Sequence, residues 1–140
     1  MITKYETVVT NTGGRNGKVF SPDKTFSMDI EPPSKPDEKN ITATNPEQLF
    51  AAGYSSCFNN ALESTMRRNK VSFESSTVTA FVSLLYNPED QGHEIGVRLQ
   101  VSVKGISLEE TRKYVAVAHT RCPYSKAIRG NVDVKIEVVE

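Results

Sequence analysis

The residues from Asn45 to about Asn69 predict a long helix that is apolar on nearly every side of its first half. Asn45 is a favourable N-cap residue, Pro46 suits the first helical position, and Gln48 stands where a capping-box partner belongs. A helix that is apolar nearly all round must be covered on all sides, and one sheet of a small domain covers only one side. We therefore expect a second subunit to pack on this helix, which predicts a homodimer. The apolar and small residues of this helix are Leu49, Phe50, Ala51, Ala52, Gly53, Tyr54, Phe58, Ala61, Leu62 and Met66.

Alternating apolar and polar residues predict strands on both sides of this helix. Residues 78–84 and 95–103 alternate strictly and are separated by turn-forming residues, which predicts a hairpin with one buried face. Residues 132–138 alternate again and predict a closing strand. Residues 5–30 mix apolar residues with glycine and proline turn signals, which predicts short antiparallel strands, and the proline-rich residues 31–43 predict an irregular crossing loop.

A second helix is indicated between the hairpin and the closing strand. Ser107 and Glu110 form a capping-box pattern that opens a helix to about Arg121, and Pro123 interrupts this helix and starts a short new turn. The order of strands, long helix, hairpin, helix and strand predicts an α+β fold, with residues 1–140 as a single domain.

Composition and charge limit the partners and the compartment that we expect. Apolar residues make up 37% and charged residues 24% of the 140 residues, which is typical of a folded chain. The formal net charge is +0, so no global field attracts nucleic acid or anionic lipid. The first residues do not resemble a secretion signal, and no apolar run reaches the roughly 18 residues of a membrane span. We expect a cytoplasmic protein without nucleic-acid or membrane partners.

Cys57 and Cys122 are the residues that most suggest chemistry. A permanent disulfide is improbable in a reducing compartment, so the two cysteines are free thiols, metal ligands or members of a catalytic cycle. Cys57 falls within the long helix, where burial raises the pKa of a thiol, and it needs a cation to ionise. Arg15 is the candidate cation, because a guanidinium stays charged and can bridge a thiolate and a carboxylate, and Glu47 could orient it. Cys122 stands at a helix start, which favours its thiolate and makes it the natural partner for an oxidised Cys57.

Helix geometry constrains this hypothesis. Glu47 and Cys57 are ten positions apart, which on an unbroken helix corresponds to roughly 15 Å of rise and a rotation of about 80°. Three alternatives follow: the helix breaks near Gly53, Glu47 enters the site from a partner subunit, or Arg15 contacts only one of the two residues at a time.

Each candidate also has a simpler structural interpretation. Cysteine is often a small buried residue, an arginine in a hairpin turn is usually exposed, and Glu47 in the first turn of a helix compensates the helix dipole. The three aromatic residues at spacing four could form core or could line an entrance that prefers an organic peroxide. His119 with Cys122, and His93 as a further ligand, give only a weak metal pattern, and we expect no metal site. The three aromatic residues are Phe50, Tyr54 and Phe58.

Long motifs that follow one another in order are specific to one family. They are residues 13–17, 43–54, 57–58, 101–105, 122–125 and 129–134. On these motifs the chain closely resembles the organic hydroperoxide resistance family, a branch of the superfamily that includes osmotically inducible proteins, and the likeness covers essentially the whole chain.

The resemblance implies a thiol-dependent peroxidase that reduces organic hydroperoxides, including lipid-derived ones, to alcohols. It implies a Cys57 sulfenic acid, a disulfide between Cys57 and Cys122, and Arg15 and Glu47 as the activating pair. It further implies antiparallel sheets wrapped around a long central buried helix in an intertwined homodimer, with the sites at the interface. Dihydrolipoyl groups or another dithiol would recycle the disulfide, and no metal or bound organic cofactor is implied.

The chain departs from the family pattern at residues 34–42, where a glycine-rich approach to the helix is common. Two alternative functions remain open at this point. One is a peroxidase of the osmotically inducible branch, which shares the fold and the thiols. The other is a non-enzymatic dimeric module that senses redox state or binds lipid, in which the same disulfide switches the binding of a partner.

Overall fold

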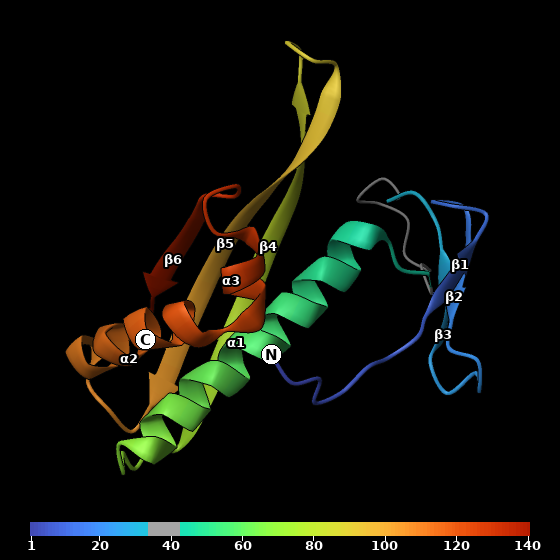
Figure 1. Ribbon diagram of the computed structural model, residues 1–140. Coiled ribbons are helices and arrows are strands. Elements are labelled where there is room, and N and C mark those ends of the chain that lie inside the picture. Colours follow the sequence, from blue (N-terminus) through green and yellow to red (C-terminus); the bar gives the residue numbers. More distant parts are fainter. Residues whose placement is uncertain (34–42) are drawn as a thin grey trace. The chain divides into compact units, whose positions relative to one another are not determined.

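The computed structural model describes residues 1–33 and 43–140, which form two compact units, Met1–Leu49 and Phe50–Glu140 (Figure 1). Both helices and sheets are present, which confirms the α+β fold class. Most of the predicted crossing loop, residues 34–42, lies outside the described residues. The expectation of a single domain over residues 1–140 stays a prediction.

The first unit is built on a small antiparallel sheet of three strands in the order β1-β2-β3. The strands are β1 (Thr10–Thr12), β2 (Gly17–Phe20) and β3 (Ser27–Ile30), as the turn signals in residues 5–30 predict. Asn11 pairs with Val19 across the first turn. The sequence prediction of short antiparallel strands is therefore confirmed.

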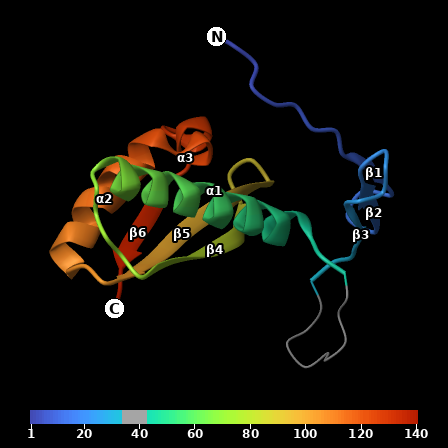
Figure 2. The ribbon, with the colours of Figure 1, turned by 90° about the horizontal axis from the view of Figure 1, so that it is seen from below.

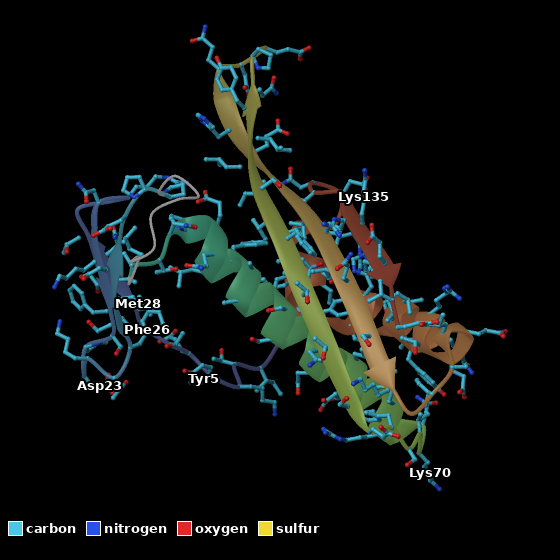
Figure 3. The ribbon with its side chains drawn as sticks, turned by 180° about the vertical axis from the view of Figure 1, so that it is seen from behind. Tyr5, Asp23, Phe26, Met28, Lys70 and Lys135 are labelled. Carbon is cyan, nitrogen blue, oxygen red and sulfur yellow. The ribbon has the colours of Figure 1, made fainter. Side chains whose placement is uncertain are left out.

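This small sheet buries little apolar surface within its own unit. Among the described residues of the first unit, Ile30 is the one buried apolar side chain, at 2% exposure. Phe26 and Met28 are 38% and 36% exposed, and Figure 3 shows both beside the β1–β3 sheet. A sheet with so little buried apolar surface cannot be stable by itself and needs further packing.

Backbone hydrogen bonds connect this sheet to the start of the long helix. Thr44 forms an isolated bridge with Ile30, and its amide donates to the Asp29 carbonyl at 2.9 Å. Asn45 then caps the helix, because its Oδ1 accepts the Gln48 amide at 2.8 Å. The side chain of Gln48 does not complete the expected capping box; its Oε1 accepts the Thr44 hydroxyl at 2.7 Å instead.

The second unit contains a sheet of three longer strands in the order β4-β5-β6. Strands β4 (Ser75–Asn87) and β5 (Gly92–Lys104) form the predicted hairpin, with Ala80 opposite Leu99. Strand β6 (Val134–Val138) pairs with β5 in parallel. The closing strand is thus confirmed, and its parallel direction is set by the helices that carry the chain back along the sheet.

Helices cover one face of this second sheet (Figure 2). They are α1 (Pro46–Arg68), α2 (Leu108–Arg121) and α3 (Pro123–Ile128), with boundaries close to those that the sequence predicts. Ser107 caps α2 through its Oγ, which accepts the Glu110 amide at 3.2 Å. No helix of the described second unit lies on the opposite face of the sheet, and Lys135 of β6 projects from that face in Figure 3. The core residues between helices and sheet are Tyr54, Phe58, Ala61, Leu62, Met66, Val97, Leu99, Val101, Val103, Tyr114, Val115, Ala118 and Cys122.

Helix α1 buries one stripe and exposes another. The buried positions recur every three or four residues, from Tyr54 to Met66, while Ala52, Ser56 and Asn60 on another side are exposed. Among the described residues of the second unit, the helix is therefore covered on one side, although its first half has few polar residues. This uncovered side agrees with the reasoning that led to the homodimer, and the homodimer itself stays a prediction.

No described helix combines the length and the hydropathy that a membrane span requires.

Candidate active site

The structure brings Arg15 and Glu47 together within the first unit. The Arg15 Nη2 lies 2.6 Å from Glu47 Oε1, and Nη1 lies 3.0 Å from Oε2. The guanidinium therefore donates two parallel hydrogen bonds to the carboxylate. These bonds lower the pKa of Glu47 and raise the pKa of Arg15. Glu47 therefore stays a carboxylate and orients the arginine, the geometry that the sequence proposes for this pair.

A glycine turn positions Arg15 for this contact. Gly13 and Gly14 adopt the left-handed conformation, at φ +78° and +61°, which favours residues without a Cβ. Asn11 holds the turn from the preceding strand: its amide donates to the Gly14 carbonyl at 3.0 Å and its Oδ1 accepts the Gly14 amide at 3.1 Å. Arg15 leaves this fixed turn with 51% of its side chain exposed, while Glu47 is only 14% exposed.

Helix α1 continues through Gly53 without interruption. The sequence-based alternative in which the helix breaks near Gly53 is therefore wrong. The reason for a glycine here is packing: a Cβ at this position would overlap the hydroxyl and ring of Tyr124. The alternatives with a partner subunit, or with one contact of Arg15 at a time, stay predictions.

Cys57 and Cys122 meet within the second unit as free thiols. Cys57 is half-buried on α1, and burial raises the pKa of its thiol above the ordinary value of 9.0. The backbone amide of Tyr124 donates a hydrogen bond to Cys57 and opposes this rise, whereas a hydrogen bond with Cys122 and the charge of Cys122 add to it. This environment is consistent with the expectation that burial raises the pKa of Cys57 and that its thiol needs a cation to ionise.

Cys122 occupies the junction of α2 and α3. Its side chain is 0% exposed and belongs to the hydrophobic core. Its backbone amide donates to the Ala118 carbonyl at 2.8 Å, and Pro123 follows as the first residue of α3. This junction places a buried second thiol against the half-buried first one, so Cys57 is the thiol that a solute can reach first.

A cavity of about 480 Å³ opens beside Cys57. Its walls come from the side of α1 that carries Cys57, from the end of α2 and from the start of α3. The cavity is large enough for a small organic molecule. A thiol in the wall of such a cavity is a candidate nucleophile.

A buried polar chain lies behind the thiols. The Tyr54 hydroxyl is 2.7 Å from Ser125 Oγ, and Ser125 Oγ is 2.9 Å from His119 Nδ1. Burial and the Arg129 charge lower the pKa of His119, which favours its neutral imidazole. Either order of donation along Tyr54, Ser125 and His119 gives each of the three groups a hydrogen-bond partner.

The three aromatic candidates of the sequence analysis separate in the structure. Tyr54 and Phe58 are both 0% exposed and pack in the core. Phe50 is half-buried and lines a different cavity, of about 410 Å³, together with Ile128 and Val132. Edge-to-face contacts join Phe50 to Tyr124, at 5.8 Å between ring centroids.

Sequence reasoning missed the contributions of Tyr124 and Ser125. Pro123 at the first position of a helix indicates that the amides after it have no partner within the helix, which is a signal that one of them could bind an anion. The sequence does not say that the Tyr124 amide meets Cys57, or that Ser125 meets Tyr54, because those contacts join residues far apart in the chain.

This α+β fold with two neighbouring thiols is the setting in which the chain was compared with known families. Residues 36–137 match the family model described as OsmC-like protein. The chain belongs to this family. Its curated relatives include the organic hydroperoxide resistance protein OhrA of Bacillus subtilis, which is 48% identical over 97% of this chain and 96% of the relative. This match confirms the resemblance to the organic hydroperoxide resistance family that the motifs indicated.

Solved structures agree with this assignment. OhrB of Bacillus subtilis superposes with a TM-score of 0.87 and 42% identity, over 98% of this chain and 100% of that chain. An organic hydroperoxide resistance protein from Elizabethkingia anophelis superposes with a TM-score of 0.90 and 38% identity, over 100% and 99% of the two chains. These relatives thus resemble the chain in sequence and share its fold over nearly the full length.

Proposed function

We propose that this protein is a thiol-dependent peroxidase that reduces organic hydroperoxides, including lipid-derived ones, to alcohols. The observation that carries the proposal is the pair of free thiols, with the more exposed Cys57 in a cavity wall and the buried Cys122 against it. The names of the relatives, which are organic hydroperoxide resistance proteins, support the same substrate class.

The first step oxidises Cys57. Its thiolate attacks the outer oxygen of the hydroperoxide, an S–O bond forms, the O–O bond breaks, and the leaving alkoxide takes a proton to become the alcohol. Cys57 is left as a sulfenic acid. The Tyr124 amide contributes here, because a hydrogen bond to the sulfur favours its charged form.

The second step joins the two sulfurs. The Cys122 thiol attacks the sulfur of the sulfenic acid, an S–S bond forms and water leaves. A dithiol, such as a dihydrolipoyl group, then reduces this disulfide by two thiol–disulfide exchanges and becomes a cyclic disulfide itself. Both cysteines return to the thiol form, and no metal or bound organic cofactor takes part.

Arg15 and Glu47 are proposed as the pair that ionises Cys57. The support is the resemblance of their motifs to the family and the orientation of Arg15 by the two hydrogen bonds that it donates to the Glu47 carboxylate. Phe50, Tyr54 and Phe58 are proposed to make the surroundings of the thiol apolar, and of the three only Phe50 has a surface on a described cavity.

The protein is also proposed to act as an intertwined homodimer in the cytoplasm. Exposed apolar residues of the β1–β3 sheet and of the β4–β5 hairpin support a partner that covers them. In the hairpin, the exposed fractions are 45% for Leu84, 48% for Leu85 and 60% for Tyr86. Light scattering at micromolar concentration should give twice the mass of one chain, and a monomer would contradict the homodimer.

The function is tested with cysteine variants in a peroxide and reductant panel. Cys57→Ser should abolish peroxidase turnover, whereas Cys122→Ser should permit one oxidation and then stall or over-oxidise. Mass spectrometry should find a sulfinic or sulfonic acid on Cys57 in Cys122→Ser and a Cys57–Cys122 disulfide in the wild type. Retention of steady-state turnover by both variants would refute the mechanism.

The same panel separates the alternatives. Faster turnover of cumene hydroperoxide than of hydrogen peroxide is expected for the proposed function, and the reverse preference would favour the osmotically inducible branch. A redox-sensing module would form the disulfide once but would not turn over repeatedly with a dithiol.

A further inference from the structure

A hydrogen-bonded chain of three side chains leads from the interior of the second unit toward its surface. The Tyr54 hydroxyl is 2.7 Å from Ser125 Oγ, and Ser125 Oγ is 2.9 Å from His119 Nδ1. Tyr54 and Ser125 are both 0% exposed, whereas His119 in the last turn of α2 is half-buried. The chain therefore runs from two closed hydroxyls to an imidazole that borders on solvent.

The two hydroxyls of this chain share helical faces with the two thiols. Tyr54 precedes Cys57 by three positions on α1 (57 − 54), and residues three apart face the same side of a helix. Ser125 follows Cys122 by the same interval (125 − 122), since Cys122 is the N-cap and Ser125 the third residue of α3. The charges of both thiols raise the pKa of Tyr54, so its hydroxyl lies within the influence of either sulfur. The chain thus begins beside the thiols and ends at His119.

Such a chain can hold its hydrogens in two orders. In one order Tyr54 donates to Ser125 and Ser125 donates to His119, and in the other order both bonds are reversed. When each hydrogen shifts along its own bond, one proton is carried from one end of the chain to the other. Hydroxyls donate and accept at the same time, and an imidazole takes up and releases a proton near neutral pH. These side chains therefore suit proton transfer.

The proposed disulfide step requires a proton to move between buried groups. Cys122 attacks as a thiolate, and the hydroxyl that leaves the oxidised Cys57 needs a proton to become water. Cys122 is 0% exposed, so bulk water cannot collect its proton. The proton must pass either directly between the reacting atoms or through the side chains beside them.

We propose that Tyr54, Ser125 and His119 form a relay that holds the Cys122 proton during disulfide formation. The inference rests on the proposed peroxidase function and adds residues to its second step. Cys122 gives its proton to the Tyr54 oxygen, while Tyr54 passes its own proton to Ser125 and Ser125 passes its own to His119 Nδ1.

The relay then runs in reverse as the disulfide forms. The electron pair of the Cys122 thiolate makes the S–S bond to Cys57, and the S–O bond breaks with its electron pair on the departing hydroxide. His119 returns the proton through the two hydroxyls to that hydroxide, and water leaves. Protons and electrons balance within the two sulfurs and the relay, so this step needs no outside reductant.

The surroundings of His119 suit it as the group that holds the proton. Burial and the charge of Arg129 lower the pKa of His119 below its ordinary value of 6.5, so at neutral pH the ring is free to take a proton and readily returns it. Arg129 is fixed there, because its Nη2 donates to the His119 carbonyl at 2.8 Å. The other titratable groups that act on the chain are Tyr54 and Cys57 of α1 and Cys122 between α2 and α3.

The test times the two steps separately in a single turnover. Reduced protein is mixed with one equivalent of cumene hydroperoxide, and mass spectrometry of quenched samples follows the Cys57 sulfenic acid and the disulfide with time. His119→Asn is the main variant, because its side-chain oxygen can still accept from Ser125 but cannot hold a proton. Tyr54→Phe interrupts the relay at its other end. His93→Asn is the matched control, because His93 is the other histidine of the chain and is exposed near the start of β5.

The readout is the rate constant of disulfide formation. At neutral pH, His119→Asn and Tyr54→Phe should form the disulfide about a hundredfold more slowly than the wild type, which is the lower end of the effect of a positioned acid–base group. With excess hydroperoxide, both variants should therefore accumulate more Cys57 sulfinic acid than the wild type. His93→Asn should stay within about twofold of the wild-type rate.

The pH profile separates proton transfer from a merely structural role. In the wild type, disulfide formation should slow as the pH falls through the lowered pKa of His119, because a protonated ring cannot take a further proton. His119→Asn should lack this acid-side loss, and its deficit should shrink as the pH rises and hydroxide replaces the missing base. A purely structural defect would lower the rate by the same factor at every pH.

The relay is overturned if His119→Asn forms the disulfide at the wild-type rate, or if its deficit is the same at every pH. Tyr54→Phe is judged on its rate by the first of these criteria, so the result does not depend on one variant. A wild type that forms no disulfide would contradict the proposed function itself. A wild type that forms the disulfide, with variants that match it, removes the relay alone and leaves direct transfer between the reacting atoms.

Discussion

Ser125 is the centre of the buried polar chain, and its replacement by alanine gives a sharp test of the structure. The single hydroxyl of Ser125 serves Tyr54 at 2.7 Å and His119 at 2.9 Å. Tyr54 is 0% exposed, so in Ser125→Ala its hydroxyl loses its partner and has no access to solvent. His119 is half-buried and can bind water in place of the serine.

The magnitude follows from these two unequal losses. A buried hydroxyl without a partner costs about 1–3 kcal/mol, and a satisfied net hydrogen bond contributes about 1 kcal/mol. We expect Ser125→Ala to lower the free energy of unfolding by about 2 kcal/mol and Tyr54→Phe to lower it by about 1 kcal/mol, because Ser125 keeps His119 in the second variant. The double variant has no unsatisfied tyrosine, so its loss should be smaller than the sum by about 1 kcal/mol.

Urea unfolding followed by far-ultraviolet circular dichroism measures these free energies. All variants are compared at one protein concentration, since assembly would couple stability to concentration. Ser83→Ala, on the exposed side of β4, is the matched serine control and should change stability by less than about 0.5 kcal/mol. Additive losses in the double variant, or a Ser125→Ala variant as stable as the control, would refute the buried chain as described.

Three further predictions concern the site. Gly53→Ala places a Cβ against the hydroxyl and ring of Tyr124. It should lower the free energy of unfolding by about 1–3 kcal/mol, although alanine has the better helix propensity. In a thermal melt, adding Tyr124→Phe should restore part of this loss. Because Arg15 lowers the pKa of Glu47, the stability that the Glu47 carboxylate contributes is complete above its ordinary pKa of 4.5 and is lost as the pH falls through the lowered value. Glu47→Gln should lack this acid-dependent loss of stability. Parallel acid titrations of the wild type and Glu47→Gln would contradict this prediction. Burial keeps the pKa of Cys57 above 9.0 within the second unit. In Arg15→Ala, the rate of Cys57 oxidation should therefore still rise with pH beyond about 9, whereas the wild-type rate should level off at a lower pH. Identical stopped-flow pH profiles of the two proteins would remove Arg15 from the mechanism.

Local patterns predicted most of the elements because their causes are local. The structure confirms the caps at Asn45 and Ser107 and the alternation along β5, each of which depends on residues a few positions apart. The chemistry of an arginine and a glutamate also sufficed to propose the Arg15–Glu47 contact, although 32 positions separate them.

The parts that the sequence did not predict depend on tertiary packing. Tyr54 and Ser125 are 71 positions apart, and nothing in either segment specifies the other as its partner. Gly53 looked like a possible helix break, but the actual constraint is the ring of Tyr124 against it. The Tyr124 amide reaches Cys57 only because α3 starts beside α1, which is a property of the folded unit.

The unequal burial of the two sulfurs gives the proposed reaction a direction. Cys122 is sealed in the core at 0% exposure, while Cys57 borders an open cavity. A dissolved oxidant therefore encounters Cys57 first, and the sulfur nearest to Cys122 is that of Cys57 itself. The fold thus imposes an order of events by access alone, and it shields the resolving thiol from damage until the moment at which it is needed.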